Sequence, residues 1–102
     1  MVDHSTELMT KLNRETSRIG WEELQRFYAQ GAVLVIAPDL DLIMTAAAVA
    51  NDDAKAIAAW MAEGKLVKAS EQLAQQWFAA KAEMWAVVVA PWVLVQPERV
   101  TQ

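Results

Sequence analysis

Apolar positions recur at helical spacing along the first 30 residues. Over 4–19 the intervals are four, four and three, which places one apolar stripe on a helix; its members are Leu8, Leu12, Thr16 and Ile19. A second stripe follows Gly20, and Glu22 and Glu23 stand in its first turn, where the helix dipole favours negative charge. Gly31 is a typical left-handed helix stop. The pattern therefore predicts helices over 4–19 and 21–30.

After Gly31 the pattern of apolar residues no longer has the spacing of a helix. Residues 32–37 are short, β-branched and apolar in both alternating phases, which is typical of a strand covered on both faces. Pro38 ends this strand. Residues 40–50 are rich in Ala and apolar nearly all round, which predicts a buried helix.

Three further elements are predicted from capping and stop signals. A helix over 53–63 follows the Asn51-Asp52-Asp53 break, with Ile57, Trp60 and Met61 facing inward, and Gly64 stops it. Residues 65–68 are predicted to form a short strand at the edge of the sheet, because lysines on an edge strand discourage pairing with other molecules. Ser70 caps a helix over 71–81, whose inward residues are expected to be Leu73, Trp77 and Phe78.

The last predicted element is one long strand over 84–96, interrupted at Pro91. The order ααβααβαβ describes an α+β domain, predominantly helical, with a small three-stranded sheet. The length fits a single domain over 1–102, with a core of about 5–96 and a frayed tail over 97–102.

The amino-acid composition argues against several classes of function. The chain has no Cys, which excludes thiolate chemistry and favours a reducing cytoplasm, and no leader pattern opens it. The net charge is −4 and the basic residues are scattered, so nucleic-acid binding is not expected. The longest apolar run, 84–95, is shorter than the roughly 20 residues that span a bilayer, so no membrane segment is expected.

The most suggestive chemistry lies where the first predicted strand ends, at Asp39 and Asp41. An apolar strand followed by Asp-x-Asp is how some phosphotransfer enzymes present a nucleophilic carboxylate beside Mg²⁺. Local structure explains the pair more simply, with Asp39 as the cap of the next helix and Asp41 as its first-turn charge. A carboxylate-based metal enzyme is therefore the weakest hypothesis.

Other catalytic or cofactor groups are not expected. The only histidine is His4, which has no second His or Cys to complete a metal site. The chain has five tryptophans. Core packing is their default role, and a Trp-lined pocket for a small molecule is the alternative; its walls would come from Trp60, Trp77, Trp85 or Trp92.

The carboxyl-terminal strand suggests self-association. Alternation puts Trp85 and Trp92 on opposite faces, and neither face carries a charge, so both need cover. A symmetric partner is a common remedy for an open apolar edge. We therefore expect a homodimer, with Trp85, Trp92 and Leu94 as possible interface residues. The competing interpretation is a central strand that is fully buried in a monomer.

Three segments together resemble a known family of short bacterial proteins, domain of unknown function 2288. They are Trp21-Glu22-Glu23-Leu24, Pro38-Asp39-Leu40-Asp41-Leu42 and the ending from Trp85 to Gln96, Trp-Ala-Val-Val-Val-Ala-Pro-Trp-Val-Leu-Val-Gln. The resemblance covers most of residues 8–96 and implies a stand-alone bacterial cytoplasmic domain. It implies no catalytic residue, cofactor or partner.

The sequence therefore leaves three hypotheses, each from a different class of function. The first hypothesis is a non-enzymatic interaction or structural domain that self-associates. The alternatives are a small-molecule binding module and a metal-dependent enzyme that uses Asp39 and Asp41.

Overall fold

The central element is a five-stranded mixed sheet. The computed structural model describes the backbone of residues 4–97 and the side chains of residues 7–97. Within this part the strands lie in the order β1-β4-β5-β2-β3, with β5 and β2 parallel and the other pairs antiparallel. Their bounds are Ser17–Gly20 (β1), Val33–Ile36 (β2), Leu66–Lys68 (β3), Glu83–Val89 (β4) and Trp92–Gln96 (β5).

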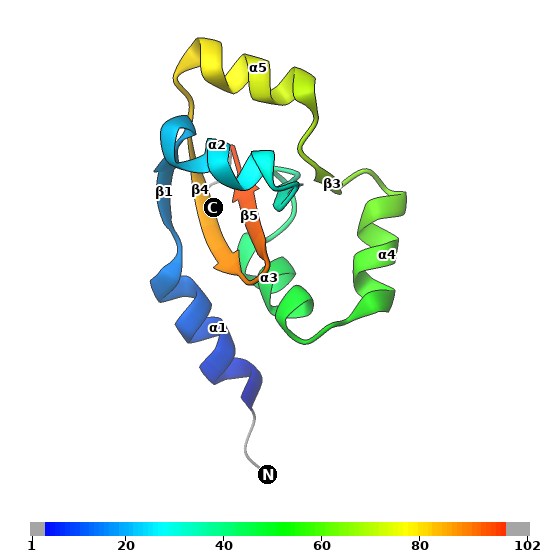
Figure 1. Cartoon of the computed structure of the whole chain (residues 1–102). Coiled ribbons are helices and arrows are strands. Elements are labelled where there is room, and N and C mark those ends of the chain that lie inside the picture. Colours follow the sequence, from blue (N-terminus) through cyan, green and yellow to red (C-terminus); the bar gives the residue numbers. More distant parts are fainter. Residues whose placement is uncertain (1–3, 98–102) are drawn as a thin grey trace.

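Helices cover both faces of this sheet (Figure 1). On one face α1, α3 and α4 enclose a core with Leu34, Val87 and Leu94 at its centre. On the other face α2 and α5 enclose a second core around Val33, Met84 and Val95. The helices are His4–Glu15 (α1), Trp21–Ala29 (α2), Leu42–Ala50 (α3), Ala54–Ala62 (α4) and Glu71–Ala80 (α5).

Several sequence predictions are confirmed. The α+β class holds, the strand over 33–36 is buried on both faces, and β3 is an edge strand. Ser70 caps α5 by accepting a hydrogen bond from the Leu73 N–H (3.1 Å). Gly64, with a φ of 73°, follows the end of α4 in the left-handed region, where a side chain would be strained. Among the described residues 4–97, none of the helices is long and apolar enough to cross a membrane.

The first predicted helix was too long. It ends at Glu15, and 17–20 form β1, where Ile19 pairs with Met84 and joins the second core. The Thr16 hydroxyl donates to the Leu12 carbonyl (2.8 Å) at the point where the helix ends. The position of Ile19 fits a helical spacing and a strand equally well in the sequence alone. Its packing in the sheet decides in favour of the strand.

The predicted long strand over 84–96 is a hairpin of β4 and β5. The pair Val89 and Trp92 closes it around Ala90-Pro91. Proline cannot donate a ladder hydrogen bond, and it suits a turn. The two turn residues reverse the alternation, so Trp85 and Trp92 lie on the same face of the sheet, contrary to the prediction. The order is thus αβαβααβαββ, and the sheet has five strands rather than three.

The tail expected to fray lies outside the described residues, apart from Pro97.

Candidate functional site

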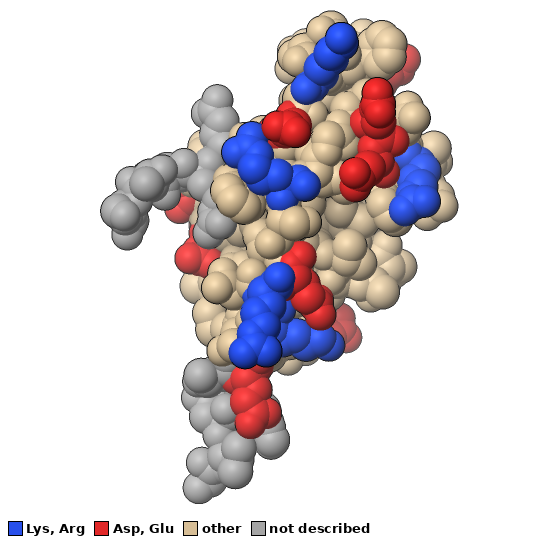
Figure 2. Space-filling model, turned by 90° about the vertical axis from the view of Figure 1, so that its left-hand side faces the viewer, with Lys and Arg blue, Asp and Glu red and all other residues tan. Residues whose placement is uncertain are grey.

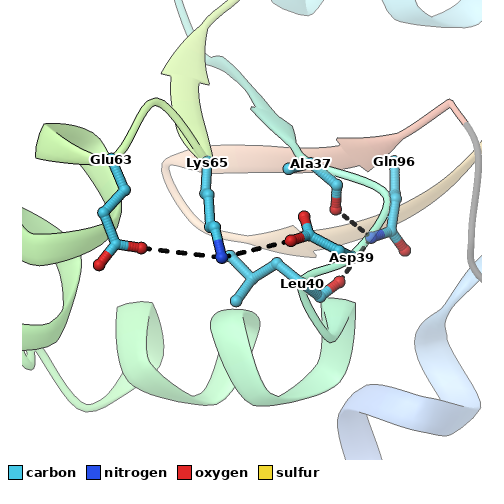
Figure 3. Close-up of polar contacts among 6 residues, drawn as sticks. All are labelled: Ala37, Asp39, Leu40, Glu63, Lys65 and Gln96. Carbon is cyan, nitrogen blue, oxygen red and sulfur yellow. Dashed lines mark hydrogen bonds and ion pairs between the residues drawn. The ribbon is translucent and has the colours of Figure 1, made fainter.

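The turn from β2 to α3, which holds both candidate aspartates, is fixed by a buried glutamine from β5 (Figure 3). The Gln96 side chain is 1% exposed, and its Nε2 donates to the carbonyl oxygens of Ala37 (2.7 Å) and Leu40 (2.6 Å). The Leu40 N–H also donates to the Ala37 carbonyl, which closes the turn. The Oε1 atom of Gln96 is buried without a hydrogen-bond partner among the described residues. Gln96 is therefore a structural clamp.

The two aspartates in this turn have different roles from those predicted. Asp41, rather than Asp39, caps α3, because its Oδ1 accepts the Met44 N–H (2.8 Å). The turn closed by the Leu40 N–H delays the helix by two residues, and this displaces the cap from Asp39. Asp41 is thus held by the backbone of its own helix.

Asp39 instead faces a lysine across the turn. Its Oδ2 lies 3.2 Å from Lys65 Nζ, which is also 3.8 Å from Glu63 Oε2 (Figure 3). The Asp39 side chain is 60% exposed, so this is a surface ion pair of about 0–1 kcal/mol. No group of three or more His, Cys, Asp or Glu side chains among the described residues could hold a metal. The hydrogen bonds and the ion pair described here give the turn an architectural role.

The suggested interface residues lie in or against the first core. Leu94 is fully buried, while Trp85 and Trp92 are half-buried and pack against that core. The Arg18 guanidinium lies 5.5 Å from the Trp85 ring, and the Lys68 ammonium lies 5.9 Å from the Trp92 ring. In this fold Leu94 presents no exposed surface, and the two tryptophans present only part of theirs.

The tryptophans suggested as pocket walls lie on the two faces of the sheet. Trp60, Trp85 and Trp92 pack against the first core, whereas Trp77 belongs to the second core across the sheet. Trp77 lies 6.1 Å from Trp21, centroid to centroid. Core packing accounts for this arrangement.

A groove does open at the α2–α5 end of the molecule, with a volume of about 630 Å³. Its apolar lining includes Trp21, which begins α2, and Phe78 and Ala79, which end α5. Phe78 is 70% exposed, whereas the neighbouring Trp77 is buried. An exposed aromatic side chain beside a groove is typical of a binding surface. We refer to this groove as the α2–α5 groove.

The charged residues that line the α2–α5 groove, which we call its rim, are mostly acidic. Glu22 and Glu23 come from the first turn of α2, Glu83 begins β4, and Lys81 is the basic member. Figure 2 shows this side of the molecule, where charged side chains surround an area of uncharged residues in the upper half. Glu83 Oε2 also lies 3.8 Å from an Arg18 guanidinium nitrogen. The lining of the groove thus combines apolar side chains with three carboxylates and one ammonium group.

Comparisons with known proteins place the chain in a family. Residues 7–97 match the family model described as "Protein of unknown function (DUF2288)". The chain belongs to the DUF2288 family. A solved structure, the NMR solution structure of PA1075 from Pseudomonas aeruginosa, shares 44% identity with a TM-score of 0.79. The match covers 99% of this chain and 93% of that one. The search of curated proteins returned no match.

In this DUF2288 chain, sequence reasoning missed the groove because it placed Phe78 inward. Leu73 and Trp77, four residues apart, do form the inward stripe of α5. Phe78 instead follows Glu71 and Gln75 at intervals of four and three, which places it on the polar face of the helix. That spacing is the feature of the sequence from which the exposure of Phe78 could have been predicted. Met61, also predicted inward, is 46% exposed on α4 for the same reason: Ile57 and Trp60 already form the inward stripe there.

Proposed function

We propose that this protein is a non-enzymatic interaction domain that binds a segment of another protein in the α2–α5 groove. The single observation that carries the proposal is the exposure of Phe78, 70%, at an apolar groove of about 630 Å³. Single exposed apolar side chains are normal on a protein surface, but Phe78 differs from them because it lines a groove together with Trp21 and Ala79. Aromatic anchors are common among the residues that dominate binding energy at protein interfaces.

The contacts of the other candidate residues support the α2–α5 groove as the binding surface. Asp41 caps α3, Asp39 forms a surface ion pair, and the four tryptophans pack against the two cores. Each of these residues thus has a structural contact of its own, which favours a binding surface elsewhere on the molecule.

Self-association through the carboxyl-terminal strand stays a prediction, and the position of β5 in the sheet changes the physical argument for it. β5 lies between β4 and β2, and helices cover both of its faces, so it presents no open apolar edge. The true edges, β1 and β3, are four and three residues long and carry Arg18 and Lys68. Short, charged edges discourage strand pairing between molecules. The α2–α5 groove is therefore the better-supported contact surface.

The experiment is a selection from a random 12-residue phage-displayed peptide library. It is run in parallel on wild type, on Phe78→Ser and on Met61→Ser. The last is the matched control, because Met61 is also an exposed apolar side chain on a helix but does not line the groove. Peptides that bind wild type and Met61→Ser but not Phe78→Ser support the proposal. A selection that returns no peptide dependent on Phe78 contradicts it.

A further inference from the structure

The charges around the α2–α5 groove define the chemistry of its occupant. Three carboxylates, those of Glu22, Glu23 and Glu83, stand at the rim against the single ammonium of Lys81. Two helix ends meet at the same groove, the carboxyl-terminal end of α5 at Ala79 and the amino-terminal end of α2 at Trp21, and their partial charges, negative and positive, offset each other. The excess of carboxylates over ammonium groups therefore decides the sign of the charge. The edge of the groove thus favours a positively charged ligand.

The two glutamates of α2 contribute most of this field. Glu83 is partly compensated by Arg18 at 3.8 Å. Glu22 and Glu23 are exposed, and neither forms an ion pair with any residue in the described part of the chain. The nearby Arg26 guanidinium lies over the Phe27 ring, 4.8 Å from its centroid. Both carboxylates are therefore available to a partner.

We propose that the segment bound in the α2–α5 groove is a cationic peptide of another protein, with a bulky apolar side chain flanked by Lys or Arg. The inference rests on the proposed function and adds the chemical class of the partner. The apolar side chain packs on Phe78 and Trp21, while the flanking cations meet Glu22 and Glu23. Matching charge across an interface mainly improves association rate and selectivity.

The same charges argue against a second copy of this chain as the occupant. Docking two α2–α5 grooves face to face about a two-fold axis would bring both acidic rims together. Each copy also carries a net charge of −4. Like charges placed opposite one another suppress such a pairing. A different, basic chain is the complementary partner.

The test uses the peptides from the selection that need Phe78. Their sequences are expected to be enriched in Lys and Arg together with Leu, Phe or Trp. The tightest peptide is then synthesised, and its Kd is measured by isothermal titration calorimetry with wild type, with the double variant Glu22→Gln/Glu23→Gln, and with Glu71→Gln. Glu71 is the matched control, because it is a first-turn glutamate of α5 that does not line the groove.

The double variant is expected to raise Kd about fivefold or more, and Glu71→Gln to leave it within about twofold. The affinity for wild type should fall between 50 and 500 mM NaCl, because salt screens exposed charges. Peptides that need Phe78 but are neutral or acidic, or that bind the double variant as tightly as wild type, would overturn this inference while leaving the proposed function intact. A selection that yields only peptides indifferent to Phe78 would overturn both. A selected peptide that copies a segment of this chain would overturn the assignment to a different partner.

Discussion

Replacing Gln96 tests the clamp that holds the β2–α3 turn. In Gln96→Leu the side chain keeps a similar size, but the Leu40 carbonyl loses its amide donor at 2.6 Å and the Ala37 carbonyl loses one at 2.7 Å. Ala37 keeps the Leu40 N–H as a second donor, so Leu40 is the more costly loss. A buried acceptor without a donor costs about 1–3 kcal/mol, and a lost hydrogen bond about 1 kcal/mol.

One gain offsets part of this cost. The substitution removes the Oε1 atom, which is buried without a partner among the described residues. We therefore expect a net destabilisation of about 2 kcal/mol. This corresponds to a decrease in Tm of roughly 8–16 °C for a domain of this size. Urea titration followed by Trp fluorescence should show a lower midpoint with an unchanged slope. A loss below about 0.5 kcal/mol would refute the clamp.

The variant Gln96→Glu adds a pH signature. The introduced carboxyl is buried and faces two carbonyl oxygens, so the pKa of its folded state is raised above the ordinary value. A raised pKa means that the stability is retained below the unfolded-state pKa, about 4.3, and is lost as pH rises through the folded-state pKa. Relative to wild type, the urea midpoint should be clearly lower at pH 8 than at pH 5. An equal deficit at both values would contradict the geometry.

The remaining predictions concern the cap, the groove and the oligomeric state. Asp41→Ala should cost about 0.5–2 kcal/mol in urea unfolding, whereas Asp39→Ala should cost no more than about 1 kcal/mol; the reverse order would restore Asp39 as the cap. Phe78→Ser should leave stability within about 0.5 kcal/mol of wild type, whereas Trp77→Ala should cost about 3–5 kcal/mol; equal losses would mean that Phe78 is a core residue. Light scattering at micromolar concentration should give the 11.3 kDa monomer, and twice that mass would instead support self-association.

The sequence predicted most elements wherever a local signal marks their ends. Ser70 caps α5, Asp53 caps α4, and glycines follow α2 and α4. These signals depend on a few neighbouring residues, so they can be recognised without the fold. The parallel pairing of β2 and β5 has no local signal of this kind and appears only in the structure.

The failures have non-local causes. Ile19 fits a helical spacing as well as it fits a strand, and its pairing with Met84, far along the chain, decides the outcome. Two turn residues around Pro91 reverse the alternation of the last strand, which moved Trp92 to the face of Trp85. The candidate site was missed because Phe78 was assigned to the core by its hydrophobicity rather than by its position on α5.

The most direct test of the interaction function is an amide chemical-shift titration of the ¹⁵N-labelled protein with the tightest Phe78-dependent peptide. We expect the largest shifts over 20–23 and 78–83, the two segments that form the α2–α5 groove. Saturation of those shifts should follow a single Kd that agrees with calorimetry. Shifts concentrated instead on the β2–α3 turn at 37–41, or on α1, α3 and α4, would contradict the groove as the docking surface.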